Sequence, residues 1–204
     1  MGTVRTIAII GATEEGAAAI VRSLAKNNVR LLLIANDHQK ASALKDRLEN
    51  DGAKAELLVM ECAREASWEA DMIVIATPYD VYGEIAGRIR PVATGKVVIS
   101  IPGRAASCPG TSAAEELQKL LPYSKIVKTF NTEVISPLTG GNQPELLIAG
   151  NSGDAVDAVA DLVRSTGLRP VVVGDLTLSR ELEAMPLKVL NLAIKRKSGW
   201  PGHH

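Results

Sequence analysis

The sequence is poor in aromatic residues, which make up 3% of its 204 residues and include a single phenylalanine. The core must therefore be built from valine, isoleucine, leucine and alanine. The formal net charge is zero, because 23 basic residues balance 23 acidic ones. This balance argues against nucleic acid as a partner, since phosphate binding normally requires a basic excess. With 46% hydrophobic and 23% charged residues, the composition excludes a disordered or fibrous chain.

Long apolar runs and cysteine clusters are also absent. The longest apolar stretches, residues 29–35 and 71–77, are far shorter than the roughly 20 residues that span a bilayer. Residues 1–11 are too short an apolar stretch for a signal peptide and favour a strand. Cys62 and Cys108 form neither a C-x-x-C motif nor a zinc spacing, so we expect two buried thiols in a reducing compartment. We therefore expect a soluble, cytoplasmic protein without membrane contact or a metal site.

Apolar β-branched runs alternate with helical patterns along the chain. The predicted strands are residues 3–10, 29–35, 55–60, 71–76, 96–101, 125–129, 145–149 and 170–173. The predicted helices are residues 17–24, 37–50, 81–89, 113–121, 155–165 and a long amphipathic segment from about 176 to 196. Strands that are apolar on both faces and alternate with helices indicate a parallel sheet covered on both sides.

The predicted fold class is therefore α/β, with a doubly wound, mainly parallel sheet. This is a Rossmann-like NAD(P)-binding fold with a small C-terminal helical extension. We expect a dinucleotide-binding domain over residues 1–150. The extension over residues 151–204 is expected to pack on the same core and to contact a second copy of the chain.

The first strand-to-helix turn is a G-x-G-x-x-G frame with a threonine in the middle glycine position, and it reads Gly11-Ala12-Thr13-Glu14-Glu15-Gly16. In such a frame the first glycine permits a tight turn, and the last lets helix and strand approach closely. The middle glycine lets a diphosphate lie against bare backbone at the helix N-terminus. Thr13 takes some of that room, although its hydroxyl can donate a hydrogen bond to a phosphate.

Glu14 and Glu15 leave two interpretations of this turn open. Two carboxylates repel a diphosphate unless both side chains point to solvent and only backbone amides face the ligand. The alternative is an ordinary strand-to-helix turn whose acidic residues favour the positive N-terminus of the helix. The turn is thus either a nucleotide site or a purely structural element.

The second strand ends at a cluster of polar residues, Asn36-Asp37-His38-Gln39-Lys40. In dinucleotide-binding folds an acidic residue at this tip binds the ribose hydroxyls of NAD, whereas a basic or small polar cluster accepts the 2′-phosphate of NADP. Asn36 stands at the tip, and His38 and Lys40 could reach a 2′-phosphate. Alternatively, Asp37 caps the next helix and Lys40 is a solvated side chain. The cluster favours NADP over NAD.

With the later segments added, the chain resembles the NADP oxidoreductases that depend on the deazaflavin coenzyme F420, relatives of the STEAP metalloreductase domains. The similarity runs from residue 4 to about residue 197. It rests on the glycine turn, on the strand ends at residues 75–78 and 97–102, and on 147–150, 167–174 and 179–183. Its most specific match, similar to the family's K-A-F-N-T element, is Val127-Lys128-Thr129-Phe130-Asn131-Thr132.

The resemblance implies NADP as cofactor with NAD as second choice, a deazaflavin or flavin as second redox partner, and a homodimer. It places the diphosphate over residues 11–16 and the adenosine phosphate near residues 36–40. The middle of the dinucleotide would pass the next strand end, formed by Ala76, Thr77 and Pro78. The nicotinamide would lie near Ile101, Pro102 and residues 130–132.

Two departures from the family pattern weaken the phosphate-holding positions. Thr13 replaces the middle glycine, and Asn36 replaces an arginine that the family typically carries after the second strand. Asn131 stays open between binding a carboxamide or substrate and capping a turn. Arg180 and Glu183, three residues apart on the last predicted helix, are expected to form a local ion pair.

No acid–base constellation and no nucleophile motif is visible, so no catalytic residue is predicted. Hydride transfer between a nicotinamide and a flavin-like ring needs little acid–base help. The leading hypothesis is an NADP(H)-binding oxidoreductase that passes hydride to or from a deazaflavin, flavin or other small redox acceptor. The second is a catalytically silent Rossmann module with weak or lost dinucleotide binding that acts through a protein partner. A third, an NAD-dependent reductase of an imine or 2-keto compound, lacks a visible proton donor.

Overall fold

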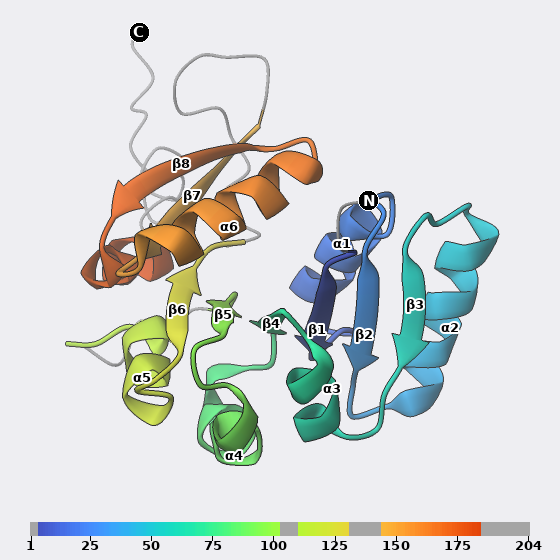
Figure 1. The fold of residues 1–204 in the computed structure, drawn as a ribbon, viewed down its shortest axis with the longest axis horizontal. Helices are drawn as coiled ribbons and strands as arrows, with labels where there is room; N and C mark the ends of the chain where they lie inside the picture. The colour runs from blue at the N-terminus through green and yellow to red at the C-terminus, as the bar shows by residue number, and fades with distance from the viewer. Residues whose placement is uncertain (1–3, 103–109, 131–143, 185–204) are drawn as a thin grey trace, which may run out of the picture.

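The protein is described from a computed structural model, which covers residues 4–102, 110–130 and 144–184, without the side chain of Glu15. The strands form one sheet that runs across the molecule (Figure 1). In spatial order they are β3 (Glu56–Val59), β2 (Arg30–Ile34), β1 (Thr6–Ile10), β4 (Met72–Ile75), β5 (Val97–Ser100), β6 (Lys125–Lys128), β7 (Glu145–Gly150) and β8 (Arg169–Gly174). Neighbours from β3 to β6 are parallel, β6 and β7 are antiparallel, and β7 and β8 are again parallel.

Helices cover both faces of the sheet. The core of one face is formed with α1 (Glu15–Leu24), α2 (His38–Asn50) and α6 (Gly153–Ser165). The core of the other face is formed with α3 (Ala63–Glu69), α4 (Tyr82–Ile89) and α5 (Ala113–Leu120). Strand side chains alternate between the cores, as Ile9 lies in the first and Ile10 in the second. The predicted doubly wound α/β fold is confirmed.

The strand order reverses between β1 and β4. The chain winds outward from β1 to β2 and β3, then crosses back to β4 and continues to β5 and β6. The connections that follow β1 and β4 therefore leave the sheet in opposite directions. In doubly wound sheets the crevice at this switch point, outside the carboxyl ends of the strands, is where ligands bind.

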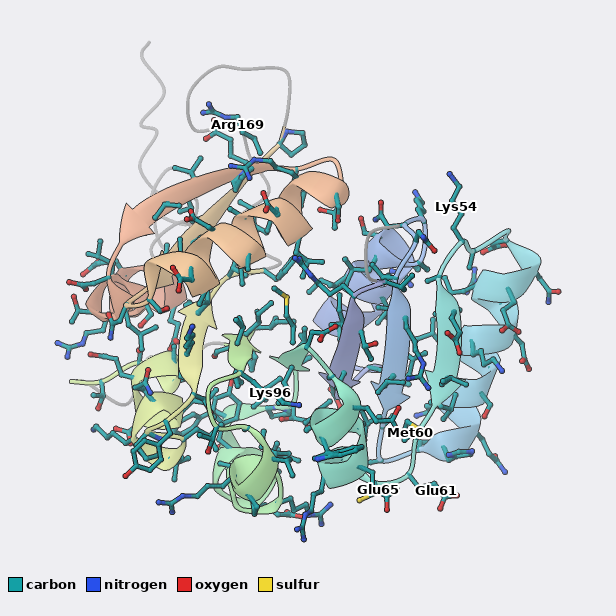
Figure 2. All side chains as sticks on the ribbon, viewed as in Figure 1. Lys54, Met60, Glu61, Glu65, Lys96 and Arg169 are labelled. Carbon is teal, nitrogen blue, oxygen red and sulfur yellow. The ribbon has the colours of Figure 1, made fainter. Side chains whose placement is uncertain are left out.

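Helix α3 is an element that the sequence pattern did not predict. It has seven residues, and no side chain caps its N-terminus. Its C-terminal end is held by Lys96, whose ammonium donates to the carbonyl oxygens of Ser67, Trp68 and Ala70 at 2.7, 2.6 and 2.8 Å. Figure 2 shows this side chain reaching from the start of β5 toward α3. The helix thus depends on a contact that is distant in sequence, which no local pattern reveals.

Two further predictions need correction. The long helix predicted from about residue 176 begins instead as a 3₁₀ turn, η3 (Leu176–Leu178), because the Asp175 carboxylate accepts from the Thr177 N–H at 2.9 Å. Residues 179–184 are helical, and the rest of the predicted helix lies outside the described residues. Cys62 is half-buried, not buried, and Cys108 lies outside the described residues. The division at residue 150 stays a prediction.

Candidate functional site

The ends of β1, β4 and β5 lie side by side, which brings together most of the predicted dinucleotide residues. The Ala76 N–H donates to the carbonyl of Ile10 at 2.9 Å, and the Ile101 N–H donates to the carbonyl of Ile75 at 3.1 Å. Ala76 and Ile101 are buried, at 8% and 5% exposure. Residues that follow three neighbouring strands therefore share one edge of the sheet, at the switch point.

Gly11 closely approaches Ala76 and Thr77, the residues that follow β4. Its φ of +87° lies in the left-handed region, and a Cβ added there would lie 2.9 Å from the backbone nitrogen of Thr77. Glycine is therefore required both by conformation and by space. The N–H groups of Gly11 and Ala12 both donate to the carbonyl of Ile34, at 2.8 and 2.9 Å. These two donors tie the turn to the end of β2.

The rest of the glycine turn leads into α1. Thr13 is half-buried, and Gly16 lies in the first turn of the helix. Glu14 is the N-cap residue, with an exposed side chain that makes no capping hydrogen bond. The positive N-terminus of α1 is therefore not capped by that side chain. Glu14 meets the condition stated above, that its carboxylate point to solvent, whereas the Glu15 side chain is outside the described part.

Thr77 lies beside the glycine turn, and its side-chain hydroxyl is buried. Thr77 is 6% exposed, and among the described residues its Oγ1 has no hydrogen-bond partner. A buried hydroxyl without a partner costs about 1–3 kcal/mol. A phosphate oxygen is the kind of acceptor that would satisfy it, so this atom fits a diphosphate bound over Gly11. Pro78, the next residue, is exposed.

At the tip of β2 the helix-capping interpretation is confirmed. The Asp37 carboxylate accepts from the Lys40 N–H at 3.0 Å and caps α2. The Lys40 ammonium lies 3.7 Å from the other carboxylate oxygen, and its side chain is 74% exposed. Asn36 and His38 are exposed as well. Asp37 is thus engaged by its own helix, while the tip presents an uncharged Asn36 and a basic Lys40 to solvent.

The end of β5 is held by Lys128, a residue that was not among the predicted site residues. Lys128 has no exposed surface, and its Nζ donates to the carbonyl oxygens of Ile101 and Pro102 at 2.6 and 2.7 Å. Its Nζ also lies 3.7 Å from Oε1 of Glu183, which is 8% exposed. A lysine inside a strand of a sheet covered on both sides is the sequence signal that could have identified it.

Burial lowers the pKa of Lys128 to about 8, and the nearby Glu183 carboxylate opposes this shift because it favours the charged amine. The unfolded chain, with a pKa of 10.5, therefore holds more protons than the folded protein between pH 8 and 10.5. In this window the stability of the protein relative to Lys128→Met should rise with pH, by about 3 kcal/mol in total. Urea unfolding of both proteins at pH 7 to 10 measures the difference, and a constant difference would refute the prediction.

The predicted local ion pair between Arg180 and Glu183 is wrong. Arg180 instead forms two hydrogen bonds with the Glu115 carboxylate, at 2.7 and 2.6 Å. Glu183 accepts from the backbone N–H groups of Ala113 and Ala114, at 2.8 and 3.2 Å. Both side chains bind the first turn of α5 instead of each other. Glu183 accepts from the N–H groups that this turn leaves without an intrahelical partner, and Arg180 pairs with its acidic side chain.

The remaining predicted site residues are placed as follows. Pro102 is half-buried, and Asn131 lies outside the described residues. Phe130, just before it, is 4% exposed and has a φ of +56°, which is unusual for a residue with a side chain. Across the described ranges no three His, Cys, Asp or Glu side chains are grouped to hold a metal ion. None of the helices described is long and apolar enough to cross a membrane.

Comparison with known proteins agrees with the resemblance stated from the sequence. Residues 6–102 match the model of the family described as NADP oxidoreductase, coenzyme F420-dependent. The chain is 29% identical over 215 aligned positions to the F420-dependent NADP reductase of Methanocaldococcus jannaschii, and the alignment covers 96% of each. It is also 35% identical over 82 positions to the metalloreductase STEAP3 of Rattus norvegicus, covering 39% of this chain and 17% of that protein.

Solved structures share the fold. A protein from Arthrobacter sp. FB24, provisionally described as an F420-dependent NADP-reductase, matches with a TM-score of 0.70 at 21% identity, over 95% of this chain and 94% of its own. A pyrroline carboxylate reductase of Plasmodium falciparum with NADP bound matches with a TM-score of 0.59 at 18% identity, over 98% of this chain and 72% of its own. At these identities the likeness supports the fold alone.

Proposed function

We propose that this relative of the coenzyme F420-dependent NADP oxidoreductases binds NADP(H) at the ends of β1, β2, β4 and β5 and transfers hydride between the nicotinamide and a small redox acceptor. The acceptor we propose is a deazaflavin such as coenzyme F420, or another flavin-like ring. The observation that carries the proposal is the buried hydroxyl of Thr77, which has no hydrogen-bond partner among the described residues and belongs to a residue that lies beside the left-handed Gly11 turn. The similarity to the M. jannaschii reductase over nearly the whole chain supports it.

The residues present fit a diphosphate at the switch point. The backbone of the turn Gly11-Ala12-Thr13-Glu14-Glu15-Gly16 and the N-terminus of α1 would hold it, with the Thr77 hydroxyl as hydrogen-bond donor. Ala76 and Pro78 would line the passage between the two halves of the dinucleotide. Ile101, Pro102 and Asn131 would line the nicotinamide end.

The tip of β2 supports NADP as the preferred cofactor, with NAD second. Asp37 is committed to capping α2, so it is not free to accept both ribose hydroxyls as NAD-selecting acids do. Asn36 is neutral and Lys40 is an exposed cation near the same tip. We propose that Asn36, Asp37 and Lys40 surround the adenosine phosphate, with Lys40 supplying its positive charge.

For hydride transfer, the main contribution of the protein is to position the nicotinamide ring and the acceptor. When bound, NADPH supplies a hydride from its nicotinamide ring. The buried Ile101 and the half-buried Pro102 offer an apolar surface that excludes water from such a ring. The proton that a deazaflavin or flavin ring takes up together with the hydride would come from solvent, so the step requires no proton donor among the residues of this edge.

Calorimetric titration with NADPH and, separately, with NADH tests the proposal. Micromolar binding of NADPH with weaker binding of NADH is the expected result. Oxidation of NADPH by coenzyme F420 then tests the acceptor, with flavin mononucleotide as the alternative acceptor. If neither nucleotide binds, the proposed function fails.

Thr77→Val removes the unpartnered hydroxyl while keeping the shape of the side chain. We expect the free protein to gain about 1 kcal/mol of stability and the affinity for NADPH to fall about tenfold, because the hydroxyl matters only when the phosphate is present. Urea unfolding and calorimetry measure the two effects. Ser67→Ala is the matched control, since its Oγ is also buried without a partner but lies on α3, away from this edge. Equal NADPH affinity of Thr77→Val and the original protein would remove Thr77 from the site.

Lys40→Ala tests the cofactor preference. We expect the affinity for NADPH to fall about fivefold to tenfold while that for NADH stays within about twofold, since only NADPH carries the 2′-phosphate. Lys45→Ala, which removes another lysine of α2 paired with Glu49, is the control for a general loss of positive charge. Equal losses for both nucleotides would mean that Lys40 does not contact the 2′-phosphate.

A second candidate function is a silent Rossmann module that acts through a protein partner. The observation that favours it is that the Gly11 and Ala12 N–H groups are both engaged by Ile34 and that Thr13 occupies the middle glycine position. Fewer backbone donors then remain for a diphosphate. Absence of nucleotide binding in the titration, together with a folded protein, would support this candidate over the first.

We also propose that the protein is a homodimer, as the family resemblance implies. Light scattering coupled to size-exclusion chromatography measures the mass directly, against a protomer of 21.6 kDa. A cytoplasmic location remains a prediction from the sequence.

A further inference from the structure

A buried ion pair joins four parts of the chain next to the proposed nicotinamide end. Lys128 comes from the last position of β6, and Glu183 comes from the helical residues 179–184. The ammonium holds the carbonyls of Ile101 and Pro102, and the carboxylate holds the first N–H groups of α5. One pair of charges therefore contacts both ends of the connection from β5 to α5.

Lys128 supplies hydrogen bonds that the sheet does not. At the carboxyl end of β5, the last hydrogen bond to β4 runs from the Ile101 N–H to the carbonyl of Ile75. The carbonyls of Ile101 and Pro102 lie beyond it, and both accept from the Lys128 ammonium. Just below them, the Ser100 hydroxyl lies 2.9 Å from the Tyr82 hydroxyl, and both residues are buried. The backbone at the end of β5 is thus held by side chains where strand pairing stops.

Glu183 holds the other end of the connection. Besides accepting from the N–H groups of Ala113 and Ala114, it lies on the same helical segment as Ser179, whose hydroxyl is 2.5 Å from that of Ser112, the N-cap of α5. The start of α5 is therefore fixed against residues 179–184. Through the 3.7 Å contact with Lys128, it is also fixed against the end of β5.

Stability alone does not account for this arrangement. A buried ion pair seldom stabilises a fold more than well-packed apolar residues of the same volume, because both charges lose their hydration. In the neighbouring strands β4 and β5, every position except Ser100 carries an apolar side chain. Unlike aliphatic residues, the pair can form directional hydrogen bonds. These fix the positions of two backbone carbonyls and two N–H groups relative to each other.

We propose that Lys128 and Glu183 are positioning residues that place the Ile101–Pro102 backbone for the nicotinamide half of the dinucleotide. The proposal rests on the proposed function, which puts the nicotinamide next to these two residues. Neither side chain is exposed to a ligand, so both act through the backbone that they hold. The adenosine half, at the ends of β1 and β2, is not touched by the pair.

The test measures, separately, how Lys128→Met, Glu183→Gln and the double variant bind the adenosine half and the nicotinamide half of the cofactor. Binding of 2′,5′-ADP reports the adenosine half alone. The fluorescence of bound NADPH reports the environment of the nicotinamide ring, and single-turnover oxidation of NADPH by coenzyme F420 reports hydride transfer. Arg180→Gln is the matched control, because it removes the ion pair with Glu115 from the same segment without touching Lys128. Thermal unfolding of each variant identifies the temperature at which all are folded.

We expect 2′,5′-ADP to bind every variant within about twofold of the original protein. In Lys128→Met and in the double variant, the fluorescence enhancement of NADPH should fall by at least about half and hydride transfer by about tenfold to a hundredfold. The double variant leaves no buried charge unpaired, so it should recover the stability lost by Lys128→Met or Glu183→Gln without recovering hydride transfer. This separation of stability from activity is what a positioning role requires.

The opposite result is equally distinct. If the double variant regains both stability and the NADPH signal, the pair is purely structural and the inference is wrong, while the proposed function stands. If the original protein binds neither 2′,5′-ADP nor NADPH, the proposed function itself fails and the inference fails with it. If Lys128→Met does not fold, the double variant carries the same comparison.

Discussion

Replacing Glu183 by alanine should lower the free energy of unfolding by about 3–5 kcal/mol at neutral pH. The substitution leaves the fully buried Lys128 ammonium without its carboxylate, and it leaves the N–H groups of Ala113 and Ala114 without an acceptor. Removing one partner of a buried ion pair is costly because the remaining charge loses its compensation. Urea unfolding followed by circular dichroism measures the loss.

Two controls separate this effect from a general weakening of the C-terminal segment. Arg180→Gln removes an ion pair between the same segment and α5, but on the exposed surface, and should change the stability little. Adding Lys128→Met to Glu183→Ala should restore part of the loss, because no charge then stays buried alone. A loss of the same size in Arg180→Gln would contradict this account.

Gly11→Ala should destabilise the protein by about 3 kcal/mol. The left-handed φ of +87° costs a residue with a Cβ about 1–2 kcal/mol. The added Cβ would also lie 2.9 Å from the Thr77 backbone nitrogen, which cannot move without shifting the end of β4. Chemical denaturation measures the loss.

Gly52→Ala is the matched control for the conformational part of this effect. Gly52 has a similar φ of +81° but no atom within 4 Å of an added Cβ. Its substitution should cost only about 1 kcal/mol. If the two variants lose the same stability, the close approach of the glycine turn to β4 has no energetic weight.

The strands could be predicted from the sequence because burial on both faces leaves few alternatives. β4 is MIVI and β2 is RLLLI, runs of aliphatic residues that only a sheet covered by helices on both sides can accommodate. Their predicted bounds extend beyond the observed ones by one or two residues in most cases. Helix α3 could not be predicted in the same way, because Lys96 from another part of the chain holds its end.

The site was predictable where it consists of backbone geometry and not where it depends on tertiary contacts. Gly11 predicts a tight turn from the sequence alone. Thr77 follows a strand parallel to β1, so it must lie at the edge of the sheet where β1 also ends. The carboxylate partners of Lys128 and Arg180 could not be predicted, because each lies more than 50 residues away in the chain. Spacing along a helix favoured the pair Arg180–Glu183, and the N-terminus of α5 outcompeted it.

Lys128 leaves the ribosome well before the carboxylate that neutralises it. Glu183 follows 55 residues later, which is several seconds of translation at about 5–20 residues per second. Until then β6 has no counter-charge for its ammonium, so we expect β1 to β5 to pair first and β6 to dock when residues 179–184 emerge. The growing chain thus forms the crevice between β1 and β4 early and secures the end of β5 last.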